Sequence, residues 1–216
     1  LYLAKTNVIT ASVAVSGTET SDTGAAALAL DVGDNDSNTG LPCGLLLGQS
    51  NAIFADAIGI GRQKSAATLE FNPNLVGGAI VPSAYFRGVS DSAIAVWSLG
   101  DGVINSGSGE NATGISDFSG GYVNALVDTM YVGRAANNSG GSGTVAGTLT
   151  LDDGIISVGT LYDGYQPAAA LKTVTGTINV NTNSSLGVNG TLSVSGNLNL
   201  ALTTAGGTAA NGTLNI

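Results

Sequence analysis

The chain has 216 residues, with 33 glycines, six basic and fifteen acidic side chains, one cysteine and no histidine. Without histidine there is no Ser-His-Asp or Cys-His catalytic relay, and a single cysteine excludes an intrachain disulfide and a thiolate zinc site. The net charge of −9 argues against nucleic acid and anionic membranes as partners, because both bind clustered lysine and arginine.

The first predicted elements are two related β-segments. Leu1–Ile9 aligns without a gap with Leu45–Ile53, at an offset of about 44 residues. Because solenoids stack similar units on one another, an internal repeat of this kind indicates a repetitive β-fold.

An acidic segment lies between these two elements. Residues 19–41 contain few large apolar side chains and are expected to loop out of the fold. Within this loop Asp31, Asp34, Asp36 and Asn38 place hard oxygen ligands close together, as a Ca²⁺ site requires. The alternative interpretation is a solvated acidic loop without a metal.

A second repeat relates residues 51–71 to residues 124–151. In both copies an aspartate precedes a Gly-Arg pair at the same spacing: Asp56 before Arg62, and Asp128 before Arg134. An enzyme needs its site only once, so this duplication favours two structural ion pairs over a catalytic dyad.

The densest aromatic region follows the first copy of this repeat. Tyr85, Phe86 and Trp97 are candidates for contacts with glycans, because an aromatic ring offers an apolar face on which a sugar stacks. The alternative is that these side chains fill the core.

Two further segments, 103–118 and 135–146, are rich in Gly, Ser, Asn and Asp and are also expected to loop out. Asp152 and Asp153 resemble the paired carboxylates of polysaccharide hydrolases. Adjacent residues on a strand point to opposite faces, so a turn between strands is the simpler interpretation. We expect no enzymatic activity.

The last part of the chain, from Thr173 to Ile216, contains no charged and no aromatic residue. It alternates apolar with small polar side chains, which indicates short strands and no membrane insertion. Apolar pairs recur there at offsets of about 20 and 22 residues: Ile178/Val180 with Leu198/Leu200, and Leu192/Val194 with Leu214/Ile216.

These offsets predict an all-β fold, a right-handed parallel β-helix (β-solenoid) with about 20–22 residues per rung. With three short strands per rung, residues 1–216 would form one domain of about ten rungs, with loop insertions at 19–41, 103–118 and 135–146.

Two stretches carry a family resemblance: LGQSNAIFADAIGIGR at 47–62 and GTLTLDDGIISVGTL at 147–161. Their repeat texture resembles large bacterial surface and secreted proteins with autotransporter-type β-strand repeats. The resemblance implies export, a right-handed parallel β-helix, and a role in adhesion or extracellular structure. It supplies no catalytic motif.

The leading functional hypothesis is a self-assembling extracellular protein, a subunit of a filament, sheath or surface layer or a segment of a fibrous adhesin. Exposed strand edges at both ends of a repetitive β-fold invite end-to-end association. The expected self-association ends are Leu1, Tyr2, Leu3, Leu214, Asn215 and Ile216. A glycan-binding adhesin module is the alternative, and a polysaccharide-cleaving enzyme is the third hypothesis. The expected partner is a second copy or a longer parent chain, with glycans as further partners and Ca²⁺ as the only candidate ion.

Overall fold

The computed structural model describes residues 1–12, 29–35, 42–102, 111–135, 143–166, 173–183, 187–203 and 209–216. Within these ranges the regular structure is β-strand, apart from one short 3-10 helix at Val89–Asp91. The low content of helix-forming side chains in the sequence accounts for this composition.

The strands form two sheets. The eleven-stranded sheet contains β1 (Thr6–Ala11), β2 (Leu30–Asn35), β4 (Ser50–Ala55), β5 (Ala57–Gln63), β7 (Ser83–Arg87), β8 (Ile94–Asp101), β10 (Tyr122–Arg134), β12 (Gly154–Gln166), β14 (Thr182–Asn183), β15 (Val188–Val194) and β16 (Leu198–Thr203). The six-stranded sheet contains β3 (Cys43–Leu47), β6 (Ala66–Phe71), β9 (Ala112–Asp117), β11 (Thr144–Leu151), β13 (Thr173–Val180) and β17 (Ala209–Asn215).

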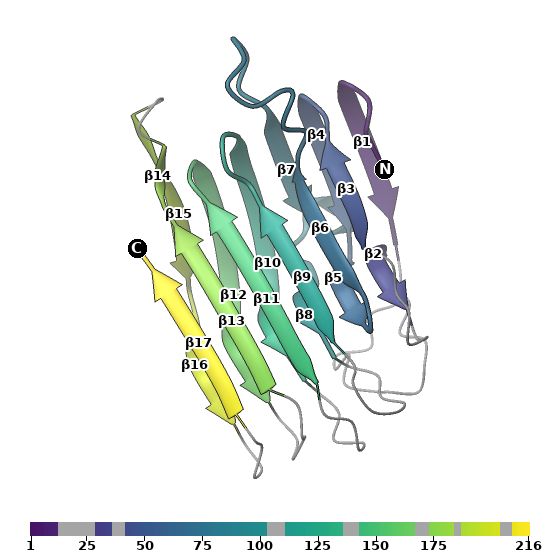
Figure 1. Ribbon diagram of the computed structural model, residues 1–216. Helices are drawn as coiled ribbons and strands as arrows, with labels where there is room; N and C mark the ends of the chain where they lie inside the picture. The colour runs from purple at the N-terminus through teal and green to yellow at the C-terminus, as the bar shows by residue number, and fades with distance from the viewer. Residues whose placement is uncertain are drawn as a thin grey trace.

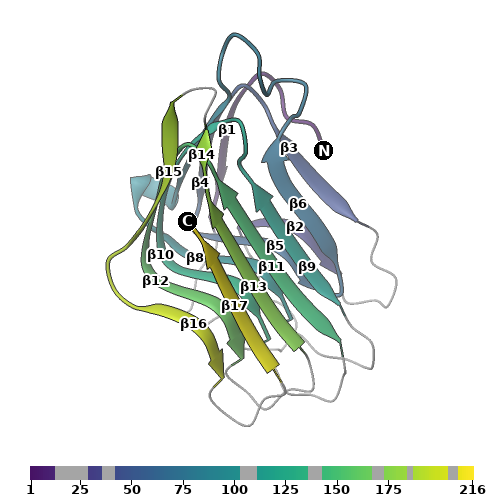
Figure 2. The same cartoon turned by 60° about the vertical axis from the view of Figure 1, so that its left-hand side comes forward.

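The chain passes alternately through the two sheets, so neighbouring strands in each sheet run parallel. Strands β14 and β15 are the one antiparallel pair among the described strands. In the eleven-stranded sheet, the long strands β10 and β12 each span two shorter strands: β10 pairs first with β7 and then with β8. Figures 1 and 2 show the two sheets facing each other, with the N-terminus beside β1 and β3 and the C-terminus at β17, on the opposite edge.

The predicted fold class, a right-handed parallel β-helix with rungs of 20–22 residues, is wrong. The protein is all-β, but its strands form two parallel sheets instead of short three-stranded rungs. Hydrogen-bonded partners in neighbouring strands lie much further apart in the sequence than 22 residues: 44 for Asn7 and Asn51, 33 for Asp101 and Arg134, and 29 for Thr150 and Asn179.

The sequence offsets of about 20 and 22 residues gave a wrong rung length because they connect strands of the two facing sheets, not paired strands of one sheet. Ile178 lies on β13 and pairs with Leu214 on β17 of the same sheet, whereas Leu198 lies on β16 of the other sheet and pairs with Leu161. Both faces supply apolar side chains to one core, so apolar pairs recur along the chain each time it crosses from one sheet to the other. The 44-residue match, in contrast, is the register in which β1 pairs with β4.

The core fills the space between the sheets. Alternate residues of most strands are buried, as the period of a strand requires. The core includes an aromatic cluster of Phe86, Trp97 and Phe118, whose ring centroids lie 4.9–6.2 Å apart. All three side chains are fully buried.

Two columns of glycine bring the sheets into backbone contact at one side of the core. On the eleven-stranded sheet the glycines have positive φ, as at Gly61 (φ +66°) and Gly133 (φ +75°). On the six-stranded sheet, Gly147 pairs in register with Gly114 and Gly176, and these glycines face the first column. A Cβ on Gly114 would overlap the carbonyl oxygen of Ile60, so the close approach requires glycine.

The three segments predicted as loops contain strands where the structure describes them. Strand β2 falls within 19–41 and pairs with β5, and β9 falls within 103–118 and pairs with β6 and β11. Strand β11 begins at Thr144, inside 135–146. The remaining parts of these segments lie largely outside the described residues.

Candidate functional site

The first edge of the two sheets lies at the N-terminus. Residues Leu1–Leu3 pair with β3 through three backbone hydrogen bonds: Leu1 N to Gly44 O (2.7 Å), Leu3 N to Leu46 O (2.9 Å) and Leu46 N to Leu1 O (2.8 Å). Leu1 is 79% exposed and Tyr2 is 70% exposed, so this short segment is held mainly by backbone contacts. It forms the outermost layer of the six-stranded sheet on this side.

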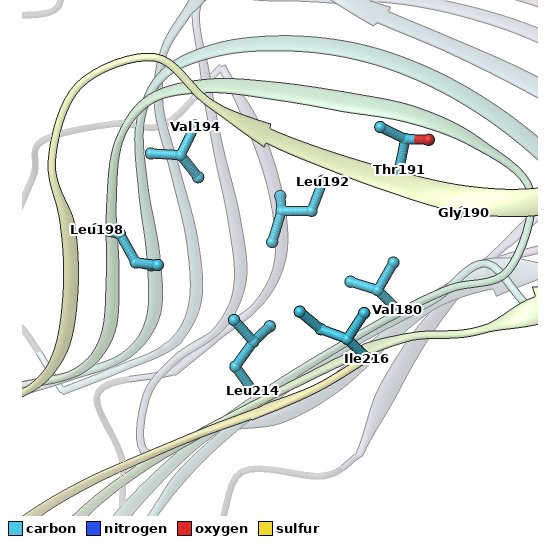
Figure 3. A pocket seen from close by; sticks show the side chains of 8 residues that line it. All are labelled: Val180, Gly190, Thr191, Leu192, Val194, Leu198, Leu214 and Ile216. Atoms are coloured by element: carbon cyan, nitrogen blue, oxygen red, sulfur yellow. The ribbon is translucent and has the colours of Figure 1, made fainter.

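The opposite edge opens directly into the core. A cavity of about 410 Å³ lies between β17 of one sheet and β15 and β16 of the other. Figure 3 shows its lining, in which all labelled side chains except Thr191 are apolar; the lining residues are Val180, Gly190, Thr191, Leu192, Val194, Leu198, Leu214 and Ile216. Leu198 is 46% exposed and Ile216 is 96% exposed. The core is therefore uncovered at this end of the described structure.

The two edges present the same apolar columns. Residues that pair from strand to strand form a column across the sheet. Followed through the six-stranded sheet, the pairing puts Tyr2 in the same column as Asn215. Its neighbours Leu1 and Leu3 therefore share columns with Leu214 and Ile216. All four of these flanking residues were predicted from the sequence as association ends.

The eleven-stranded sheet shows the same correspondence between its edges. Ile9 on β1 shares a column with Leu192 on β15. Leu30 on β2 shares a column with Leu198 on β16. An apolar side chain at one edge is thus matched by one at the other in both sheets.

Two groups of ion pairs, each built around a buried arginine, lie along β2, β5, β8 and β10 of the eleven-stranded sheet. Arg62 contacts Asp31 (3.2 Å) and Asp34 (3.1 Å), and Arg134 forms a two-pronged ion pair with Asp101. Both arginines are almost completely buried. Burial lowers the pKa of Arg134, but the charge of Asp101 outweighs this effect and the pKa rises. The ion pair with Asp101 therefore keeps the buried Arg134 charged.

The predicted ion pairs therefore have different partners. Asp56 accepts hydrogen bonds from Ser12 Oγ (3.0 Å) and from the backbone N–H of Val89 (3.0 Å), and Asp128 is exposed on β10. The arginines instead take their acidic partners from neighbouring strands. The repeated Gly-Arg spacing reflects the glycine column, since Arg62 and Arg134 both follow a glycine with positive φ.

Of the four residues of the predicted calcium loop, two are described by the structure and two are not. Asp31 and Asp34 lie on β2, where both face Arg62, and burial raises the pKa of Asp31 to about 7 against the opposing charge of Arg62. Asp36 and Asn38 lie outside the described residues. Within the described part of the chain no group of three or more acidic or cysteine side chains is arranged to hold a metal ion.

Two of the three predicted glycan contacts are not available to a ligand. Phe86 and Trp97 are fully buried and pack on each other in the core. Tyr85 lies on the opposite face of β7, where its hydroxyl donates to Asp91 (2.7 Å). Alternation along the strand separates Tyr85 from Phe86, and this period-2 rule applied to the sequence would have separated them in advance.

The candidate carboxylates of the enzymatic hypothesis lie at a turn between β11 and β12. Asp152 accepts a hydrogen bond from the backbone N–H of Gly120 (3.0 Å), and burial raises its pKa. The contact joins this turn to the turn that precedes β10.

One buried acid was not singled out in the sequence. Asp163 on β12 occupies a column whose other members include Val132 and Leu200. Its side chain has no exposed surface, and burial raises its pKa to about 7, although a hydrogen bond from the Thr213 backbone opposes this effect. Only the strand register reveals that this aspartate stands in an apolar column.

No protein-family model matches the chain, and the comparisons found no similar curated protein and no similar solved structure. Among the described residues, no helix has the length and apolar character needed to cross a membrane.

Proposed function

We propose that this protein is a self-assembling structural protein of the cell exterior, a subunit of a filament, sheath or surface layer, that associates through the two open edges of its sheets. The observation that carries the proposal is the apolar opening of about 410 Å³ at one edge, matched column by column by apolar residues at the other. Parallel strand addition would supply the backbone hydrogen bonds of the contact.

An extracellular location agrees with the composition. A chain with six basic residues, net charge −9 and one cysteine has the surface chemistry of exported β-proteins, and its repeat texture resembles bacterial surface proteins. The net negative charge also disfavours lateral aggregation between copies.

Geometry restricts how two copies join. From β1 and β2 to β15 and β16, the strands of the eleven-stranded sheet are stacked in six successive layers. For β1 and β2 of a second copy to pair with β15 and β16 of the first, the second copy must be displaced along the stack by these six layers. Its Leu1–Leu3 segment would then occupy the layer already taken by β17 of the first copy. Both sheets extend together only if β17 displaces Leu1–Leu3 and pairs with β3. The high exposure of Leu1 and Tyr2 supports this exchange.

The test compares two leucines that differ in location. Leu198 is 46% exposed and lines the open edge, whereas Leu126 is 37% exposed and points away from the core on β10. We expect the unchanged protein and Leu126→Lys to assemble in sedimentation velocity at micromolar concentration, and Leu198→Lys to remain monomeric because a charge would be buried. A monomeric unchanged protein, or equal assembly of Leu198→Lys, would exclude the proposal.

A further inference from the structure

A second hollow lies on the outer face of the eleven-stranded sheet, away from both the core and the open C-terminal edge. Its volume is about 360 Å³, and it crosses β1, β4, β7 and the start of β10. Because it lies on a sheet face, edge association leaves it accessible.

Two columns of side chains line this groove in strict register. One column is uniform in chemistry and carries a hydroxyl at every strand: Thr6, Ser50, Ser83 and Tyr122. The next outward column combines apolar and polar groups: Val8, Ala52, Tyr85 and Asn124. The lining contains no charged side chain.

Arg87 fixes the polar end of the groove. Its Nη2 donates to Asn124 Oδ1 (2.7 Å), and its guanidinium carbon lies 4.0 Å from the centroid of the Tyr85 ring. The hydroxyl of Tyr85 is held by Asp91. Two lining side chains, Tyr85 and Asn124, are therefore ordered by these contacts before a ligand arrives.

Tyr122 differs from the other described tyrosines of the outer face. It is 41% exposed, and its ring makes no contact with another aromatic ring or with an arginine among the described residues. Tyr131, Tyr162 and Tyr165 instead stack on one another. Tyr122 therefore offers a free aromatic surface beside a row of hydroxyls.

We propose that this groove binds a neutral glycan chain, with Tyr122 stacking on a sugar ring and the hydroxyl column and Asn124 exchanging hydrogen bonds with sugar hydroxyls. An uncharged lining in a protein of net charge −9 disfavours acidic glycans, which bind to cationic side chains. Four strands at about 4.8 Å spacing give a groove about 14 Å long, enough for a short run of sugar rings.

The position of the groove favours a glycan over a peptide. Strands β4 and β7 are paired on both sides, so their backbone groups cannot accept an added strand. Recognition must come from side chains, and the available groups are hydroxyls, an amide and an aromatic face.

The test uses the full chain in affinity electrophoresis through gels that contain neutral β-glucan, mannan or galactan, with polygalacturonate as the acidic comparison. We expect retardation by at least one neutral polysaccharide and none by polygalacturonate. Tyr122→Ala should weaken binding about tenfold, Tyr122→Phe should retain it, and Tyr162→Ala should have no effect because that ring belongs to the stack. Thermal unfolding checks that each variant is folded.

The proposal would be overturned by no retardation by any neutral polysaccharide, by an equal loss of binding in Tyr162→Ala, or by preferential binding of polygalacturonate. Capture of a peptide from a peptide library by the same groove, without glycan binding, would also exclude it.

Discussion

At the scale of single residues, the described structure keeps ionisable side chains inside the core at a measurable cost. Asp163 has no charged partner among the described residues that offsets its burial, and burial raises its pKa to about 7. Between about pH 4 and pH 7 the folded protein holds a proton that the unfolded chain has lost. Stability from this group is therefore fully present below pH 4 and falls as the pH rises to 7, by roughly 1.4 kcal/mol per unit of pKa shift.

Replacing Asp163 with leucine should remove this loss. Leucine has nearly the same shape and matches Val132 and Leu200 in the column. We expect Asp163→Leu to raise the melting temperature at pH 8 by more than at pH 4.5, as measured by circular dichroism. Asp163→Asn, which also cannot ionise, should show the same flattened pH dependence. An equal shift at both pH values would show that Asp163 does not titrate in this range.

The ion pair of Asp101 and Arg134 gives a second prediction at this scale. Asp101→Ala leaves the buried guanidinium without its partner, and we expect a loss of about 3–5 kcal/mol in urea unfolding at pH 7. Asp128→Ala removes the aspartate that the sequence repeat pairs with Arg134, yet it is exposed and should change stability by less than about 0.5 kcal/mol. A larger effect at Asp128 would contradict the observed pairing.

At the scale of strands, the glycine columns set how closely the sheets approach. Gly133 and Gly77 both have φ +75°, but a Cβ on Gly133 would overlap the carbonyl oxygen of Thr175, whereas nothing lies within 4 Å of a Cβ on Gly77. A comparison of alanine at Gly77 with alanine at Gly133 therefore separates the energetic cost of backbone strain from the cost of steric overlap.

We expect Gly77→Ala to cost about 1–2 kcal/mol, the strain of a left-handed alanine. Gly133→Ala should cost clearly more, because the two sheets must also separate. The measurement is the free energy of unfolding in urea. Similar values for both variants would show that the sheets adjust without cost.

Local pattern in the sequence predicts the strands but not their partners. Alternation identifies β13 and β17, and the match of Leu1–Ile9 with Leu45–Ile53 gives the register of β1 with β4. The pairing of Ile178 with Leu214, in contrast, depends on how much chain each crossing uses, and this length varies from one passage to the next. A fixed rung length was therefore the wrong assumption.

The candidate site was predictable to a similar extent. The apolar alternation of Leu214 and Ile216 identifies them as core-facing residues of a strand. The burial of Asp163 and the partnership of Asp101 with Arg134 are not visible in the sequence, because each depends on which strands become neighbours. The groove containing Tyr122 likewise arises from four strands that are distant in the sequence.

At the scale of the whole molecule, the two open edges are the feature that the rest of the structure does not explain. In the described structure Leu198, Leu200 and Ile216 lie exposed beside the open core, whereas natural β-proteins block such edges. In the proposed assembly the matching columns of the other edge would cover these residues. Removal of Asn211–Ile216 deletes the strand that must displace Leu1–Leu3, and we expect it to abolish assembly while sedimentation still shows a compact monomer.

The most direct test of the account is electron microscopy of the assembled protein, with measurement of the axial repeat. A displacement of six strand layers at about 4.8 Å each predicts a repeat of about 29 Å along the filament. A repeat near this value, with strands perpendicular to the axis, is the expected result. A repeat one layer longer would contradict the displacement of Leu1–Leu3, and particles that remain isolated at every concentration would contradict association through the edges.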